Sequence, residues 1–313
     1  MSYRQVVEDH HKTTYTNNVM MVAQQVANPL RAAVTVASAS GEAQNVADLI
    51  DKSEYSEGED YSRENPDNPP NRRRRWLVRP TVIEHGQYIT KEEKFDQAMD
   101  PSSQLMRNSV LTVERGVYDK ILGVKKVGNV YKAVRAGIMG KAIEGKGPNS
   151  TMNFPAPNYI AVDQGISGTP HGLSVAKLRA ATEAMELEDF GLETDMSIYG
   201  LITPKQKTDL INLAVETKTS LNPFEIENIR AGKPGMLLGI NWLFSNRVPV
   251  DDSGYRLIPI WSKENVVMGV WQDVQGQMWN DTARKNLPYM YNDVYVDATR
   301  IEDGGVRIIR CAE

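Results

Sequence analysis

The segment closest to a chemical motif is GKAIEGKG at residues 140–147. Its spacing matches the phosphate-binding loop G-x-x-x-x-G-K, but Gly147 stands where Ser or Thr must hold magnesium. A helix should follow such a loop and direct its N-terminal amides at the phosphate, and Pro148, Pro155 and Pro157 disfavour a helix there. We therefore interpret the segment as a Gly/Lys hairpin loop.

Few other side chains suggest catalysis or metal binding. The single cysteine, Cys311, cannot form an internal disulfide, and only four histidines are scattered along the chain, so no Cys/His zinc cluster is expected. Four carboxylates gather near the end of one predicted helix, and we interpret them as solvated surface: Glu183, Glu186, Glu188 and Asp189. We expect no enzyme activity, no catalytic residue, no cofactor and no metal.

The strongest charge pattern pairs an acidic segment with an arginine run. Residues 42–67 hold nine acids against two bases, and an Arg-rich strand follows at residues 72–79. The arginines could contact nucleic acid, serve as a localisation tag, or pair with carboxylates of another subunit, and a solvated loop is the plain alternative. We favour pairing between subunits. The candidate contact residues are Arg72, Arg73, Arg74, Arg75, Trp76, Arg79, Glu54, Glu57, Glu59 and Asp60.

Overall charge and hydropathy narrow the function classes. The chain has 313 residues with 36 bases and 40 acids, a formal net charge of −4. Such a chain is not a polycation that wraps nucleic acid, so any contact with nucleic acid must be local. No run of 18 apolar residues occurs that could span a membrane.

Hydrophobic periodicity predicts an α+β fold. Asp100 and Pro101 begin a long helix over residues 101–122, and Ser174 caps a second helix. The acidic, Pro-rich segment 42–67 and the Arg-rich strand after it predict a long projecting hairpin, because some 25 residues of such loop are unusual in a compact domain. Further predictions are a helix over 14–28, a helix opening at Thr203-Pro204, single strands over 30–37, 196–203, 236–246, 255–261 and 265–271, and a closing hairpin of strands 289–300 and 306–311.

This order of parts resembles the major capsid protein of tailed bacteriophages, which has the Hong Kong 97-type fold. Phrases such as HGLSVAKLRAATEAME, YGLITPKQKTDL and LGINWLFSNRVPVDDSG are similar to those of phage coat proteins of this size, as is the ending VDATRIEDGGVRIIRCAE. The resemblance covers the whole chain. It implies an N-terminal arm (1–39), an extended loop (40–98), a peripheral domain (99–150) with a spine helix (101–122), an axial α/β domain (151–280) and return strands of the peripheral domain (281–313).

The resemblance also implies a function. Copies of the chain would associate into pentamers and hexamers and close an icosahedral shell around the double-stranded DNA of a tailed phage, in loose contact with that DNA. The implied partners are a separate scaffolding protein, a portal and a decoration protein, with no membrane. The implied location is the virion capsid, assembled in the cytoplasm of the host bacterium. An encapsulin-like nanocompartment shell is the main alternative, and a nucleotide- or nucleic-acid-binding protein is the other.

Overall fold

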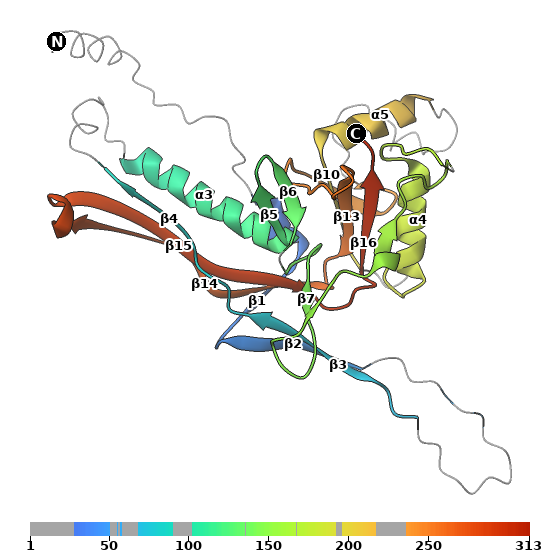
Figure 1. Ribbon diagram of the computed structural model, residues 1–313, viewed down its shortest axis with the longest axis horizontal. Helices are drawn as coiled ribbons and strands as arrows, with labels where there is room; N and C mark the ends of the chain where they lie inside the picture. Colours follow the sequence, from blue (N-terminus) through green and yellow to red (C-terminus); the bar gives the residue numbers. More distant parts are fainter. Residues whose placement is uncertain are drawn as a thin grey trace, which may run out of the picture. The chain divides into compact units, whose positions relative to one another are not determined.

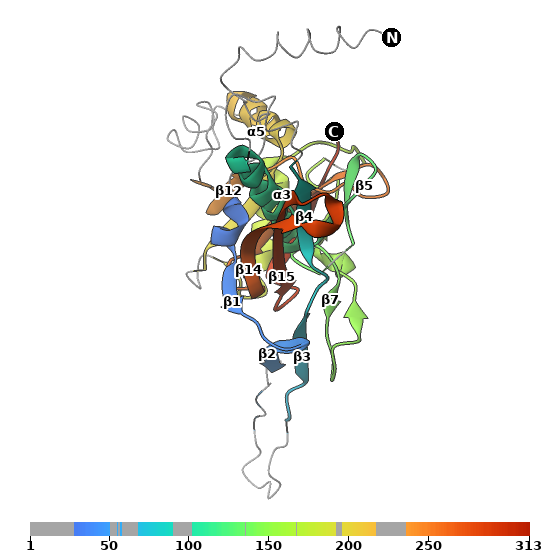
Figure 2. The ribbon, with the colours of Figure 1, turned by 90° about the vertical axis from the view of Figure 1, so that its left-hand side faces the viewer.

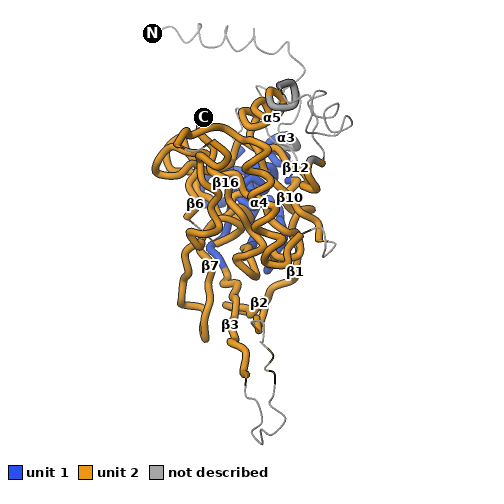
Figure 3. Tube along the Cα trace, turned by 90° about the vertical axis from the view of Figure 1, so that its right-hand side faces the viewer, with its two compact units in different colours: residues 1–28, 80–118, 270–296 blue, residues 29–79, 119–269, 297–313 orange. Residues whose placement is uncertain are grey.

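The computed structural model describes residues 28–50, 55, 57, 68–89, 102–134, 136–166, 168–191, 196–216 and 236–313. The chain divides into two compact units, coloured separately in Figure 3. Unit 1 holds residues 1–28, 80–118 and 270–296, and unit 2 holds residues 29–79, 119–269 and 297–313. The predicted helix over 14–28 lies outside the described residues, apart from residue 28.

Unit 1 holds most of a long helix and most of an antiparallel sheet. The helix is α3 (Ser102–Leu122), which confirms the predicted element, and the strands are β4 (Ile83–Tyr88), β14 (Val266–Asp281) and β15 (Leu287–Arg300). These strands belong to a four-stranded sheet in the order β1-β14-β15-β4. The Ser109 hydroxyl of α3 lies 2.9 Å from His85 Nδ1 and accepts a hydrogen bond from Asn292 Nδ2 at 2.6 Å, so the helix is fastened to β4 and β15.

Unit 2 contains a six-stranded sheet. Its strand order is β11-β12-β10-β13-β16-β9, with β10 parallel to β12 and antiparallel to β13. Almost every residue of β13 and β16 is buried, which is typical of central strands covered on both faces. The strands are β9 (Tyr159–Ile160), β10 (Ile198–Ile202), β11 (Met236–Leu237), β12 (Ile240–Phe244), β13 (Arg256–Ser262) and β16 (Val306–Cys311).

Two helices accompany this sheet, α4 (Val175–Glu186) and α5 (Pro204–Glu216), and Figure 1 shows α4 beside β16. Ser174 caps α4 as predicted, because its side chain accepts a hydrogen bond from the Lys177 backbone N–H. The buried Lys177 ammonium donates to three carbonyl oxygens, those of His171 (2.6 Å), Gly172 (3.0 Å) and Arg310 (2.9 Å). The last of these bonds ties α4 to β16. Burial lowers the pKa of Lys177.

Three small antiparallel pairs complete unit 2: β2 (Ala43–Ile50) with β3 (Arg72–Val78), β5 (Val124–Val127) with β6 (Val130–Ala133), and β7 (Ala142–Ile143) with β8 (Thr151–Met152). The pair β2–β3 confirms the predicted long hairpin, and Figure 2 shows its two strands side by side. The remaining short elements are the 3₁₀ turns η1 (Pro29–Ala33), η2 (Ala156–Asn158) and η4 (Thr282–Arg284), and strand β1 (Thr35–Ser38).

Two predicted strands are wrong in detail. Residues 29–33 form the 3₁₀ turn η1 rather than the start of a strand, and Leu30 and Ala33 are both buried, as the three-residue period of such a turn requires. The expected single strand over 236–246 is two strands, β11 and β12, joined by a tight turn. Leu238 and Gly239 both have positive φ, and two such residues in succession reverse the chain.

The predicted closing hairpin of strands 289–300 and 306–311 is also wrong. Strand β15 lies beside β14 and β4, whereas β16 pairs with β13 and β9 in the other sheet. Burial explains the separation, because most of β15 alternates between buried and half-buried residues, as in a sheet with one covered face, and β16 is buried almost throughout.

Candidate subunit interface

The arginine run lies on β3, and the structure divides it into one buried and three exposed side chains. Arg72, Arg73 and Arg74 are exposed, whereas Arg75 is fully buried. Arg75 and Leu77 are the buried positions of the strand, in keeping with the two-residue period of a strand. The run is therefore two features, an exposed basic end and a buried anchor.

The buried anchor is an ion-pair cluster. Arg75 Nη2 lies 2.7 Å from Asp303 Oδ2 and 3.0 Å from Glu144 Oε2. Asp303 also pairs with Arg300, at 2.5 Å from Nε to Oδ1, and the Arg300 side chain is fully buried as well. Burial lowers the pKa of Arg300, and the Asp303 charge opposes that shift. Two buried guanidinium groups need such carboxylates, because an unpaired charge in the interior is costly.

A side-chain and a backbone hydrogen bond hold β3 against the segment 144–145. The Trp76 indole Nε1 donates to the Gly145 carbonyl oxygen at 2.9 Å, and the Gly145 N–H donates to the Arg74 carbonyl oxygen at 3.1 Å. Trp76 thus has a hydrogen-bond acceptor within its own chain. This contact and the Arg75 cluster fix the base of the β2–β3 hairpin within unit 2.

The segment 140–147, which had the spacing of a phosphate-binding loop, contains β7 and leads to β8, its antiparallel partner. No helix follows it, because the next described elements are β8 and the 3₁₀ turn η2. Two of its backbone carbonyl groups accept hydrogen bonds from side chains of unit 2. The Gly140 oxygen accepts one from Arg300 Nη1 at 2.5 Å, and the Gly145 oxygen accepts one from Trp76 Nε1. The interpretation as a hairpin loop is confirmed.

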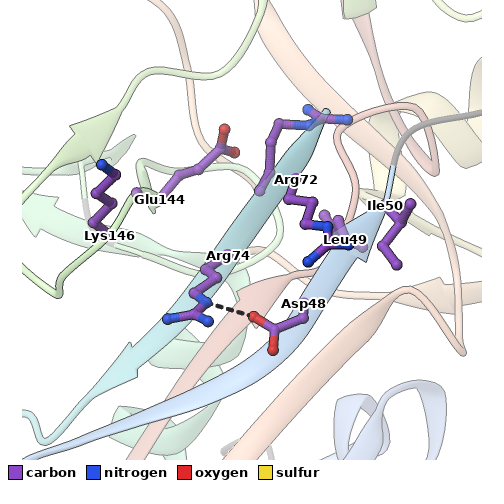
Figure 4. A pocket seen from close by; sticks show the side chains of 9 residues that line it. Asp48, Leu49, Ile50, Arg72, Arg74, Glu144 and Lys146 are labelled. Carbon is purple, nitrogen blue, oxygen red and sulfur yellow. Dashed lines mark ion pairs between the residues drawn. The ribbon is translucent and has the colours of Figure 1, made fainter. Parts of the chain in front are cut away.

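The exposed basic end borders a cavity of about 780 Å³ between the β2–β3 hairpin and residues 144–146, shown in Figure 4. Four bases and two acids are among its lining residues, so positive charge predominates. Arg74 Nε pairs with Asp48 Oδ1 at 2.7 Å across the hairpin, with both side chains more than half exposed. Such an exposed pair contributes at most about 1 kcal/mol. The lining residues are Asp48, Leu49, Ile50, Arg72, Arg73, Arg74, Glu144, Gly145 and Lys146.

The remaining predicted contact residues are not gathered at this cavity. Arg79 is exposed at the hairpin base, where its N–H donates to the Glu42 carbonyl oxygen at 2.8 Å. Glu57 is exposed, and Glu54, Glu59 and Asp60 lie outside the described residues. Sequence reasoning missed Lys146 and Glu144 as neighbours of the arginines. The only signal for Lys146 was its place in the failed phosphate-loop motif.

The part of the chain that the structure describes has three further features, which concern metal ligands, membrane-spanning helices and the cysteine. It holds no group of three His, Cys, Asp or Glu side chains that could bind a metal ion. None of its helices combines the length and apolar character needed to cross a membrane. Cys311 is buried in β16, and this burial raises the pKa of its thiol to about 12.

Comparison with known proteins identifies the family. A sequence model of the phage capsid protein family matches residues 7–313. The chain belongs to the phage capsid protein family. This capsid protein is a structural component of the virion, as the resemblance implied. No curated protein matches it in sequence.

Solved structures of phage and GTA particles share the fold of this capsid protein over 95–100% of its length. The capsid of the cyanophage P-SCSP1u has a TM-score of 0.63 at 11% identity, covering 98% of this chain and 94% of that one. The capsid of a native GTA particle gives 0.65 at 13% identity, with 95% and 93% covered. Mycobacterium phage Adephagia gives 0.63 at 11% identity, with 100% and 98% covered. The capsid protein therefore has the predicted α+β, Hong Kong 97-type fold.

Proposed function

We propose that the chain is the major shell subunit of a tailed phage, and that copies associate into pentamers and hexamers which close an icosahedral shell around double-stranded DNA. Membership of the phage capsid protein family across residues 7–313 carries this proposal. The subunit would be assembled in the host bacterial cytoplasm with a scaffolding protein and a portal, and a decoration protein could bind the finished shell. Its net charge of −4 favours loose contact with the packaged DNA.

The proposed division of labour follows the resemblance. Residues 1–39 would form the N-terminal arm, 40–98 the extended loop, 99–150 with 281–313 the peripheral domain, and 151–280 the axial domain. The exposed basic end of the β2–β3 hairpin supports an inter-subunit role for the loop, because Arg72, Arg73 and Arg74 are exposed whereas Arg75 is held in the buried cluster. Heterologous contacts of this kind close rings when the rotation between copies permits.

Electron microscopy of the purified protein tests the proposal directly. The protein should be prepared alone and with its neighbouring genes co-expressed, since scaffolding help is expected. Closed shells, or rings of five and six copies, are the expected products in at least one preparation. Dispersed 35.0 kDa monomers in both preparations would contradict a shell function.

A further inference from the structure

Bases outnumber acids among the described residues that line the cavity beside the arginines. Arg74 is paired with Asp48, and Glu144 is engaged by the buried Arg75. Within the described residues, neither Arg72 nor Lys146 has an ion-pair partner. Figure 4 shows these two side chains and Arg74 around one opening, on the hairpin and on the 144–146 segment. A carboxylate-bearing ligand fits such a set of bases.

The walls of the cavity also have an apolar part. Leu49 and Ile50 line it, and Ile50 is 63% exposed. A suitable ligand therefore combines acidic side chains with an apolar or aromatic one.

One segment of this chain has that composition. Residues 54–60 read EYSEGED, four acids around one tyrosine. Tyr55 is 86% exposed, so its ring has almost no packing partner within its own subunit. Aromatic side chains that are exposed in a free subunit and flanked by charge are frequent anchors of interfaces.

We propose that the cavity lined by Arg72, Arg73 and Lys146 is a binding site for residues 54–60 of a second copy of the chain. This inference rests on the proposed shell function. It identifies the surface that the extended loop of a neighbouring copy would bind. Each copy would offer one cavity and one acidic segment, so every contact is head-to-tail and a ring closes without a free site. Opposite charges would also set the register of the contact and speed encounter between copies.

Charge reversal on each side of the contact tests the proposal. The first variant is R72E/R73E/K146E and the second is E54K/E57K/E59K/D60K, and each alone should lose assembly. In an equimolar mixture the two variants can alternate around a ring. Each reversed cavity then meets a reversed segment and each unchanged cavity meets an unchanged segment, so every contact joins opposite charges. We therefore expect the mixture to recover rings of six but no rings of five, because an odd ring cannot alternate.

A chain that carries both sets of substitutions should recover rings of five and six by itself. K125E/K126E, which reverses two exposed bases on β5, is the charge control and should assemble normally. Circular dichroism checks that each variant is folded, and wild-type protein under the same conditions tests the shell function independently. Recovery by the combined chain without recovery by the mixture would overturn the proposal in favour of binding within one chain. Assembly by either single-sided variant, or recovery in neither case, would also overturn it.

Discussion

The chain contains two long hairpins, one of which is stabilised within its own subunit, whereas the other is left with an exposed, charged end. In unit 1, strands β14 and β15 lie in a sheet that α3 covers through Ser109. In unit 2, β2 and β3 form a two-stranded sheet among the described strands, and an isolated bridge joins Arg75 of β3 to Glu144. A two-stranded hairpin is marginal in water without a packed face. The difference suggests that the second hairpin is completed by another copy.

Side chains reinforce this difference. On the unit 1 sheet, Tyr289 packs against Tyr88 at 4.5 Å and against Trp279 at 5.0 Å between ring centroids, an aromatic ladder across three strands. The Tyr291 hydroxyl donates to Glu84 at 2.6 Å, a bond that raises the pKa of Tyr291. On the described part of the β2–β3 hairpin, Arg74 instead forms an exposed cross-strand ion pair with Asp48, next to the buried Arg75. Aromatic pairs contribute about 0.5–1.5 kcal/mol beyond the area they bury, whereas exposed ion pairs contribute about 0–1 kcal/mol.

The largest expected effect is loss of assembly when the exposed arginines are removed. R72S/R73S/R74S should fold like the wild type, because these side chains are exposed, and should form no shells. Arg75 is kept in this variant, since its burial gives it a separate role. Electron microscopy counts the shells and thermal unfolding reports the fold. K125S/K126S is the control for lost positive charge and should form shells normally. A normal yield of shells from R72S/R73S/R74S would contradict the inter-subunit role of the exposed arginines.

A large loss of stability is expected when the buried anchor of the hairpin is broken. Arg75→Met leaves Glu144 and Asp303 short of a partner in the interior, and removing one member of a buried pair costs about 3–5 kcal/mol. Urea denaturation measures the free energy of unfolding. Arg74→Met, one residue away in an exposed pair, should cost less than about 1 kcal/mol. Equal losses of unfolding free energy in Arg75→Met and Arg74→Met would contradict the division of the arginine run into a buried anchor and an exposed end.

A smaller effect is expected at the aromatic ladder. A Cβ at Gly86 would overlap the Tyr289 phenol, so Gly86→Ala must displace that ring. Overpacking of this kind costs about 1–3 kcal/mol, which urea denaturation resolves. Gly147→Ala is the control, because a Cβ there has open space and the residue does not require a positive φ. Unchanged stability of Gly86→Ala would show that the ladder does not support its hairpin.

The smallest effect concerns the pH dependence of unit 2. Burial raises the pKa of Cys311 to about 12 from an ordinary 9.0, so at pH 8 the folded protein holds about a thousandfold less thiolate than the unfolded chain. Iodoacetamide should therefore label the protein only as unit 2 unfolds. Because the folded pKa is raised, this contribution to stability is full below pH 9 and declines as the pH rises from 9 towards 12. Rapid labelling of folded protein at pH 8 would contradict the burial.

Capping residues and hydrophobic periodicity predicted the main helices. They did not predict which strands pair, because pairing depends on residues far apart in the sequence. Pro101 and the apolar period gave helix α3, and Ser174 gave the start of α4. The pairing of β16 with β13 depends on residues some 50 positions apart, so adjacency to β15 was misleading. The same holds for the arginine run, because four identical residues in a row give no sign that only Arg75 meets Glu144 and Asp303.

The central claim is that the basic cavity of one copy is filled by the acidic segment of another. It is tested most directly by zero-length carbodiimide cross-linking of shells assembled from mixed unlabelled and nitrogen-15-labelled subunits. Mass spectrometry should find Lys146 joined to a carboxylate of residues 54–60 in peptide pairs that combine one light and one heavy chain. Lys146 cross-links found only in light–light and heavy–heavy pairs would place the contact within one chain and contradict the account.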